Sequence, residues 1–250
     1  MMIKPQILPP PIMFFRFIYL SFLLCFVNAC TDSKVNQQHP VEITKDSTLP
    51  KMADTIITGW EISPIDYDSS QWTELIRLDK TIVLDMRYAT TNNFVNEQLY
   101  DCARCFLRPE AAEAVMAANQ KLKAQGYRLK MYDCFRPLPI QQRLWDKFRN
   151  PSYVTPPSKG SMHNRGLAVD LTIVDANGTE LDMGTEFDFF GKEAHHTYTG
   201  HSETVNKNRL LLKETLESLG FKGIRTEWWH YSYVGKTYDL SEMVWECEGS

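Results

Sequence analysis

The sequence predicts an α+β domain over residues 73–250, with a central, mainly antiparallel sheet flanked by helices. Two observations support this fold class. Segments with the patterns of strands and helices interleave along this part of the chain, and the connections between them are long and irregular. A doubly wound parallel sheet would have shorter and more regular connections. Motifs of the types G-x-G-x-x-G and G-x-x-x-x-G-K are absent from the sequence, so nucleotide binding has no support.

Three helices are predicted from their end signals. Pro109 suits the first position of a helix, and Gly126 suits the stop that follows it. Gly220 has the same role after the last predicted helix. The predicted helices are Pro109–Gln125, Leu138–Phe148 and Glu203–Leu219.

Four strands are predicted from apolar runs and from alternation of apolar and polar residues. The segment 150–160 carries three prolines and a glycine, which predicts a loop. The segment Asp175-Ala176-Asn177-Gly178 is a turn signal that closes the third strand. The predicted strands are Thr81–Met86, Tyr127–Tyr132, Leu167–Val174 and Trp228–Val234.

Residues 1–29 have the pattern of a secretory signal. Basic residues precede an apolar run from Phe17 to Val27. This run of roughly ten residues is too short to span a bilayer, which needs about 20. The run leads into Val27-Asn28-Ala29-Cys30, which resembles a lipoprotein processing site. Cys30 is therefore predicted to be the first mature residue and to carry lipid; the alternative is ordinary secretion, with Cys30 incidental.

Residues 30–72 are predicted to be a polar tether, because they are rich in Thr, Asp, Ser, Lys and Gln and their apolar periodicity is weak. Such a tether would let a lipid-anchored domain stand off the membrane. The predicted location is the cell envelope, periplasmic, with membrane contact only through the N-terminal anchor. The net charge of -4 is too small and too mixed to predict a nucleic-acid partner.

Four cysteines would remain in the mature domain. The chain has six, of which Cys25 leaves with the signal and Cys30 would be acylated. An even number in an oxidising compartment predicts structural thiols or disulfides, whose pairing cannot be deduced from sequence. These cysteines are Cys102, Cys105, Cys134 and Cys247.

Two segments carry residues suited to a metal. In the segment 161–170, His163 precedes a predicted strand and Asp170 lies within it. An acid in the middle of an apolar strand is costly unless it is paired or metal-bound. The second segment, Glu227-Trp228-Trp229-His230, again places an acid and a histidine at the edge of an apolar strand.

Together these segments offer two histidines and one carboxylate, His163, Asp170 and His230, as ligands of one Zn²⁺. A fourth position open for water is typical of a catalytic zinc site, and Glu227 is then free to take the proton of that water. The alternative is that each histidine is a hydrogen-bonded core residue. Residues three apart on a flat strand face opposite ways, so Glu227 must precede the strand or lie on a bulge to share a site with His230.

The combination S-x-H-x-x-G-x-A-x-D followed by E-W-W-H resembles the zinc D-alanyl-D-alanine dipeptidase family, which includes the vancomycin-resistance dipeptidases. The resemblance extends from about residue 84 to residue 233. It implies the Hedgehog/DD-peptidase-like zinc fold. Further matching segments are Asp85–Thr90, Asn92–Phe94, Tyr132–Pro137, Met183–Gly184, Phe187–Phe189 and Ala194–His196.

The resemblance assigns roles to further residues. It makes Glu227 the general base and Arg136 the group that stabilises the oxyanion, whereas the alternative for Arg136 is a surface residue that pairs with Asp133. It places Tyr88 and Asp188 near the amino end of the substrate, and Ser161 beside the substrate. His195 and His196, with His201 nearby, are interpreted as structural support, although they also allow a second metal site.

The implied reaction is zinc-dependent hydrolysis of the small dipeptide D-alanyl-D-alanine. Two rival functions stay open. One is a zinc D,D- or L,D-carboxypeptidase that acts on longer peptidoglycan stem peptides and needs a more open cleft. The other is a cell-wall-binding lipoprotein that keeps the fold without catalysis. Resistance dipeptidases act inside the cell, so an exported member points towards scavenging or recycling of wall-derived dipeptide.

Overall fold

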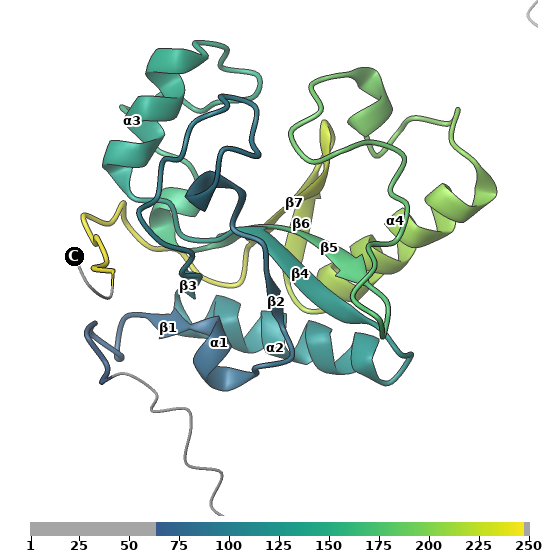
Figure 1. Cartoon of the computed structure of the whole chain (residues 1–250), viewed down its shortest axis with the longest axis horizontal. Helices are drawn as coiled ribbons and strands as arrows, with labels where there is room; N and C mark the ends of the chain where they lie inside the picture. The colour runs from purple at the N-terminus through teal and green to yellow at the C-terminus, as the bar shows by residue number, and fades with distance from the viewer. Residues whose placement is uncertain (1–63, 248–250) are drawn as a thin grey trace, which may run out of the picture. The chain divides into compact units, whose positions relative to one another are not determined.

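The computed structural model describes residues 64–247, and a five-stranded sheet lies at their centre (Figure 1). The strand order is β2-β4-β5-β7-β6, in which β2 runs parallel to β4 and the remaining pairs are antiparallel. The predicted α+β class with a mainly antiparallel sheet is therefore confirmed. The strands are β2 (Val83–Leu84), β4 (Arg128–Asp133), β5 (Ala168–Val174), β6 (Phe221–Ile224) and β7 (Glu227–Tyr233).

The three predicted helices begin at the predicted residues and end within two residues of the predicted stops. Pro109 occupies the first turn of its helix, and the Ser202 Oγ caps the last helix by accepting a hydrogen bond from the Val205 amide at 3.2 Å. The helices are α2 (Pro109–Lys123), α3 (Leu138–Lys147) and α4 (Glu203–Glu217).

Several short strands and one short helix were not predicted from the sequence. The predicted strand Thr81–Met86 is reduced to two residues in the structure, and a 3₁₀ helix at Arg87–Ala89 follows it. Two-residue strands pair antiparallel in a second small sheet, and one helix has a single turn. These additional elements are β1 (Thr73–Glu74), α1 (Leu75–Leu78), β3 (Phe106–Leu107) and β6.

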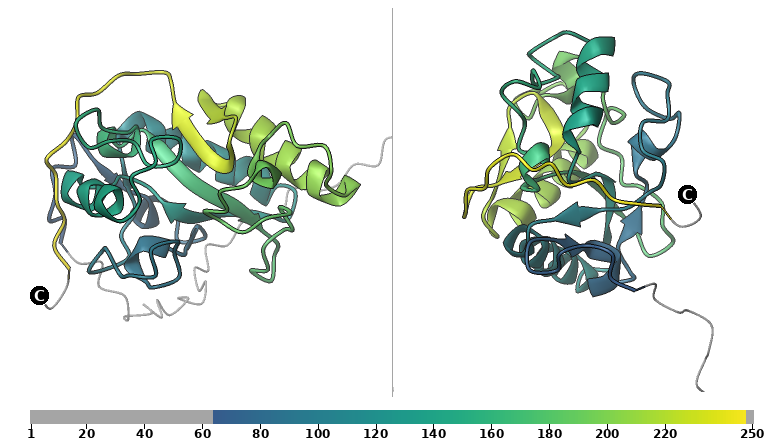
Figure 2. Two further views of the ribbon diagram at one scale, coloured as in Figure 1. Left: turned by 90° about the horizontal axis from the view of Figure 1, so that it is seen from above. Right: turned by 90° about the vertical axis from the view of Figure 1, so that its left-hand side faces the viewer.

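The sheet separates two layers. Helix α2 packs on β4, helix α4 packs on β6 and β7, and the two helices contact each other. Helix α3 and the long loops lie on the side of the sheet away from α2 (Figures 1 and 2). All seven residues of β5 are buried between these layers, which explains its nearly continuous apolar sequence. Helices of the described residues are all too short or too polar to cross a membrane.

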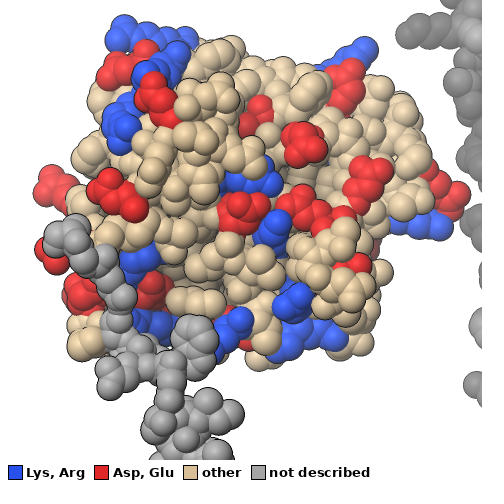
Figure 3. Space-filling model, viewed as in Figure 1, with Lys and Arg blue, Asp and Glu red and all other residues tan. Residues whose placement is uncertain are grey.

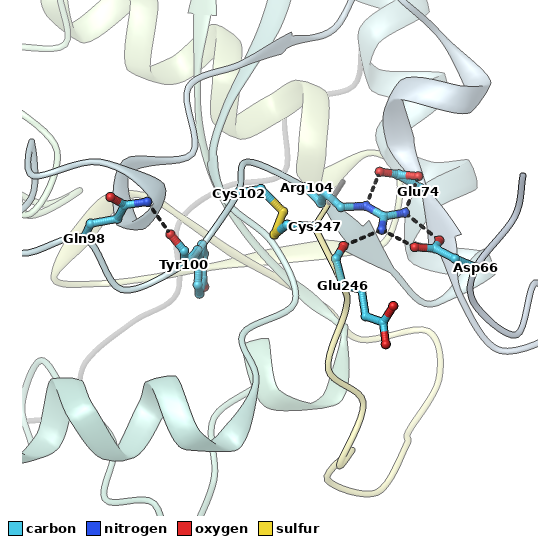
Figure 4. Close-up of a disulfide and its surroundings, with 8 residues drawn as sticks. All are labelled: Asp66, Glu74, Gln98, Tyr100, Cys102, Arg104, Glu246 and Cys247. Atoms are coloured by element: carbon cyan, nitrogen blue, oxygen red, sulfur yellow. Dashed lines mark hydrogen bonds and ion pairs between the residues drawn. A yellow bond between two sulfur atoms is a disulfide. The ribbon is translucent and has the colours of Figure 1, made fainter. Parts of the chain in front are cut away.

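The described residues that precede β1 pack on the domain. Trp72 is buried, and its ring lies 4.4 Å from that of Phe135. Asp66 accepts a hydrogen bond of 2.6 Å from Arg104, which also donates to Glu74 (Figure 4). The predicted tether ended at residue 72, so its last residues belong to the packed domain. The predicted signal peptide, Cys30 and the tether up to residue 63 lie outside the described residues.

The four cysteines of the domain form two disulfides, Cys102–Cys247 and Cys105–Cys134. The first joins the C-terminal segment to the loop before β3 (Figure 4). The second joins the start of β3 to the end of β4 and is fully buried. On the face seen in Figure 3, acidic and basic side chains are interspersed.

Candidate active site

Three polar residues form a row across the middle of the sheet. Asp170 on β5 lies opposite His230 on β7 and opposite Asp133 on β4. The β4–β5 register shifts between Met131 and Asp133, and this irregularity brings Asp133 rather than Tyr132 opposite Asp170. Because opposite residues on neighbouring strands face the same side, the register places the acid and the histidine beside each other.

His163 reaches this row from the loop that precedes β5. It begins a single 3₁₀ turn, His163–Arg165, which ends at Gly166 with a φ of 72°. A side chain at Gly166 would also meet the Trp72 ring, 2.4 Å from an added Cβ. Glycine is therefore needed here, both for the left-handed backbone and for space, and the tight turn directs His163 back over the sheet.

The nitrogen and oxygen atoms of these side chains converge. The His163 Nε2 lies 3.1 Å from the His230 Nδ1 and 3.4 Å from the Asp170 Oδ2, and the His230 Nδ1 lies 2.9 Å from the Asp170 Oδ1. Of the residues that the structure describes, His163, Asp170 and His230 are the one group whose ligand atoms all lie within 4.8 Å of one another. Two imidazole nitrogens and a carboxylate fit Zn²⁺.

Hydrogen bonds on the far side of each ring leave the facing nitrogen available to a metal. The Cys134 carbonyl lies 2.7 Å from the His163 Nδ1 and can only accept, so Nδ1 carries the proton and Nε2 is left with its lone pair. The Ser232 Oγ lies 3.2 Å from the His230 Nε2 and can accept its proton, which is compatible with Nδ1 binding a metal. Metal-binding histidines are oriented by bonds of this kind.

Asp170 is suited to bind as a carboxylate. Burial on its own would raise the pKa of Asp170, but the charges and hydrogen bonds of His163 and His230 lower that pKa below its usual range. The Arg136 Nη2 lies 3.8 Å from the Asp170 Oδ2 and adds a further positive charge. The side chain is therefore ionised at neutral pH.

Glu227 shares the site because β7 departs from regular pairing. The β6–β7 register shifts between Gly223 and Ile224, so that Ile224 lies opposite Glu227 and Gly223 opposite Tyr231. The expected bulge is therefore present, and Glu227 and His230 line the same cavity. Burial raises the pKa of Glu227 to about 8, and the negative charges of Asp170 and Asp188 add to this effect.

Arg136 is buried and pairs with Asp133, as the alternative weighed from the sequence had it. Its Nε and Nη2 donate to the Asp133 Oδ2 at 2.9 and 2.7 Å, and its Nη1 donates to the Gln141 Oε1 at 3.1 Å. The pairing with Asp133 is thus real, but the residue lines the cavity rather than the surface. These bonds use three of the five guanidinium N–H groups.

Tyr88 and Asp188 lie together on another wall of the cavity. The Tyr88 hydroxyl donates to the Asp188 Oδ2 at 3.1 Å. Burial raises the pKa of Asp188 well above its usual range, and the charge of Asp170 raises it further. Asp188 also has a φ of 60°, a left-handed conformation that few residues other than glycine adopt. A cationic group placed beside Asp188 would favour its ionised form.

Ser161 lies at the loop that leads into His163 and also lines the cavity. Its amide and its hydroxyl both donate to the Asn164 Oδ1, at 2.8 and 3.0 Å. Asn164 in turn donates to the Arg136 carbonyl at 2.6 Å. The structure therefore brings Ser161 to the site and fixes its loop through Asn164.

The cavity that joins these residues has a volume of about 320 Å³. Residues of helix α3, the loop 151–155 and Trp229 also line it. The structure thus brings every predicted site residue of the domain to one cavity. These residues are Tyr88, Arg136, Ser161, His163, Asp170, Asp188, Glu227 and His230.

The other histidines of residues 64–247 lie outside this cavity. The His201 Nε2 donates to the Glu193 carbonyl at 2.7 Å, and the His195 Nδ1 lies 3.2 Å from the Arg225 Nη1. His196 packs against Tyr231, with ring centroids 5.9 Å apart. Their structural interpretation agrees with these contacts.

Sequence reasoning missed the residues that hold the site together. Asp133 was considered only as a surface partner of Arg136, yet it is fully buried and also accepts from the Tyr100 hydroxyl at 2.7 Å. Asn164 and the Cys134 carbonyl had no assigned role. Asp133 and Asn164 lie within the segments that resemble the family, and this position could have indicated a role for them. The sequence carries no indication of what a backbone carbonyl binds.

Comparison with known proteins agrees with this geometry. The peptidase family model described as D-Ala-D-Ala dipeptidase matches residues 70–245. The chain is 34% identical to a D-alanyl-D-alanine dipeptidase of Escherichia coli over 181 residues, covering 72% of this chain and 94% of the relative. It is 30% identical to a D-alanyl-D-alanine dipeptidase of Enterococcus faecalis, covering 62% of this chain and 87% of the relative.

Among solved structures, the vancomycin resistance D,D-pentapeptidase VanY in complex with Zn(II) is similar over 52% of this chain and 74% of that chain, with 19% identity and a TM-score of 0.37. The family match covers most of the domain, and the E. coli relative is matched over nearly its whole length. The matched segment also contains all the residues that line the cavity. The chain therefore belongs to the D-Ala-D-Ala dipeptidase family of zinc metallopeptidases.

Proposed function

We propose that the protein hydrolyses D-alanyl-D-alanine to D-alanine with one zinc ion per chain. The observation that carries this proposal is the convergence of His163, Asp170 and His230, in one small cavity with Glu227 and Arg136. The volume of about 320 Å³ is near the lower limit for small-molecule sites and suits a dipeptide. The dipeptidase relatives, matched over 87–94% of their length, support the same substrate.

The side chains of the cavity divide the chemistry between them. Zinc, when bound, supplies Lewis-acid chemistry, because it polarises a carbonyl and lowers the pKa of water towards 7. Glu227 accepts the proton of the attacking water and passes it to the nitrogen of the leaving amine. Arg136, which lines the cavity, holds the negative charge that develops on the carbonyl oxygen.

The protonation of Glu227 depends on the metal. A pKa of about 8 would leave the side chain mostly protonated at pH 7 and unable to act as a base. A divalent cation held by His163, Asp170 and His230 would favour the ionised carboxylate and lower that pKa. The base is therefore active only when the ligand cluster is filled.

The wall formed by Tyr88 and Asp188 would bind the ammonium group of the dipeptide. Asp188 supplies the negative charge, and Tyr88 fixes the orientation of its carboxylate. An ammonium group would offset the burial that raises the pKa of Asp188. Because residues 151–155 line the same small cavity, a longer peptide would have to fit past them to reach this acceptor.

A substrate panel tests the proposal. Purified zinc-loaded protein is given D-alanyl-D-alanine, L-alanyl-L-alanine and a pentapeptide stem that ends in D-alanyl-D-alanine, each with and without a chelator. We expect chelator-sensitive hydrolysis of the D,D-dipeptide alone. Faster release of D-alanine from the pentapeptide would replace the dipeptidase assignment by a carboxypeptidase, and no hydrolysis would indicate a binding protein.

We propose further that the enzyme acts outside the cytoplasm, held to a membrane by a lipid on Cys30, and recycles dipeptide from the cell wall. The signal-like segment 1–29 and the two disulfides of the domain support this location, since disulfides persist mainly in oxidising compartments. Cells that express the chain with and without residues 1–30 would be compared for vancomycin resistance and for fractionation of the protein. Resistance conferred by the full-length chain would contradict the recycling role.

A further inference from the structure

The Cys105–Cys134 disulfide adjoins the predicted metal site, because the Cys134 carbonyl contacts the His163 ring. Cys134 follows the last residue of β4, and Cys105 precedes the first residue of β3. Both cysteines are fully buried, and their Cα atoms are 5.3 Å apart. Beside the disulfide, the Phe135 amide donates to the Phe106 carbonyl at 2.9 Å. The start of one segment is therefore tied to the end of the other by one covalent bond and one hydrogen bond.

The segment that follows β4 makes two contacts with His163. The Cys134 carbonyl accepts from the His163 Nδ1 at 2.7 Å, and the Arg136 amide donates to the His163 carbonyl at 3.1 Å. The first contact sets the tautomer and the plane of the imidazole, and the second sets the position of its backbone. A displacement of Cys134 would therefore turn the ring that offers Nε2 to the metal.

The same segment carries the guanidinium of the site. Asp133, immediately before Cys134, accepts two bonds from Arg136. The β4–β5 pairing shifts register after Met131 and its last pair is Asp133 with Asp170, so Cys134 lies just beyond the end of the ladder. Beyond this point the sheet no longer holds the segment by hydrogen bonds, and the disulfide fixes it covalently.

We infer that the Cys105–Cys134 disulfide is a positioning element of the zinc site, which holds the Cys134 carbonyl where it orients His163. The inference rests on the proposed function for the identity of the metal. It adds that tight metal binding requires the disulfide and not only the three ligands. Partners that orient metal ligands contribute about 10- to 100-fold to metal affinity, which sets the expected size of the effect.

The second disulfide offers a matched control. Cys102 and Cys247 are partly exposed, and they join the C-terminal segment to the surface loop that holds Arg104 (Figure 4). Neither residue lines the cavity. Removing this disulfide also releases a constraint on the unfolded chain and so lowers the stability of the fold. It does not remove the bond that holds the Cys134 carbonyl.

The experiment compares two double variants of the mature protein, Cys105→Ala/Cys134→Ala and Cys102→Ala/Cys247→Ala. Each removes one disulfide and leaves no new thiol that would bind metal. Zinc affinity is measured by competition with a chelator, and the visible spectrum of the Co²⁺ form reports the coordination geometry. We expect the first variant to bind zinc about 10- to 100-fold more weakly with an altered Co²⁺ spectrum, and the control to match the wild type.

A third variant, Cys105→Val/Cys134→Val, fills the apolar space without a disulfide and is used if the alanine pair does not fold. A folded 105/134 variant with the affinity and Co²⁺ spectrum of the wild type would overturn the inference. Equal weakening in the control would also overturn it, because the effect would then follow stability alone. The proposed function is tested separately, since wild-type protein that binds zinc but does not cleave the dipeptide contradicts that function without affecting this comparison.

Discussion

At the scale of single residues, Glu227 combines a buried position with a chemistry that needs it charged. Its pKa of about 8 arises mainly from burial and reflects the metal-free protein. A cation bound by the neighbouring ligand cluster would therefore have a second effect, because it would determine whether Glu227 is ionised.

Replacing the carboxylate of Glu227 by an amide should stop catalysis without loss of metal. Glu227→Gln keeps the shape of the side chain but cannot take a proton from water. We expect kcat to fall by about 10²–10⁴ while the zinc content per chain stays unchanged. The control is Glu113→Gln on the exposed face of α2, which should leave both unchanged. Wild-type turnover in Glu227→Gln would refute the base assignment.

The raised pKa of Glu227 also makes the stability of the metal-free protein depend on pH. The unfolded chain releases this proton near pH 4.5, whereas the folded protein keeps it up to about pH 8. The contribution of Glu227 is thus fully present below pH 4.5 and is lost as the pH rises to 8. Urea unfolding should show a loss on the order of a few kcal/mol across this range, and Glu227→Gln should flatten it. Identical pH profiles of the two proteins would contradict the assignment.

Arg136 should act mainly in the transition state. Arg136→Lys keeps the positive charge beside Asp133 but loses the planar fork of donors. We expect kcat to fall by about 10²–10³ with a smaller change in KM, as measured by steady-state kinetics on the dipeptide. If only KM changes, Arg136 binds the substrate and does not stabilise the oxyanion.

At the scale of elements, the sequence predicted the parts that have long patterns or clear end signals. Helices α2, α3 and α4 and strands β4, β5 and β7 lie within two residues of their predicted bounds. Elements of two to four residues, such as β1, β3 and β6, carry too few residues for a periodicity to be detected. They form because neighbouring strands pair with them, which is information that a local pattern does not contain.

The candidate site was also predictable only where the information is local in the sequence. Side chains with distinctive chemistry, such as His163 and Asp170, were predicted from their sequence context. The features that hold them depend on packing between segments far apart in the chain. The Cys134 carbonyl is a backbone group, and four cysteines allow three pairings, so neither could be deduced beforehand.

The turn that carries His163 gives a prediction at this scale. Gly166→Ala would place a methyl group 2.4 Å from the Trp72 ring, at a φ of 72°. Gly126→Ala is the control, because its φ is 84° but an added Cβ there has no neighbour within 4 Å. Gly126→Ala should cost about 1–2 kcal/mol for the backbone alone. Gly166→Ala should cost about 1–3 kcal/mol more, since overpacking is added.

Both variants would be compared by thermal unfolding with and without zinc. The shift caused by zinc should be smaller in Gly166→Ala, because the turn also positions His163. Equal destabilisation by the two substitutions would show that the contact with Trp72 does not restrict the turn.

At the scale of the whole molecule, one arrangement serves both the fold and the chemistry. The pairing of β4, β5 and β7 places Asp133, Asp170 and His230 in one row, and the core beneath keeps β5 fully buried. The two disulfides hold the segments that the sheet does not pair. The metal would add a further tie between the loop at 163 and the sheet, because a ligand that binds only the folded state stabilises it.

The most direct test of this account is a titration of the metal-free protein with zinc, followed by the rate of D-alanine release from D-alanyl-D-alanine. The rate should rise in proportion to added zinc and become constant at one equivalent per chain, whereas His230→Ala should stay inactive at that ratio. Full activity before zinc is added, or no activity at any zinc concentration, would contradict the claim that His163, Asp170 and His230 bind the ion that makes this protein a dipeptidase.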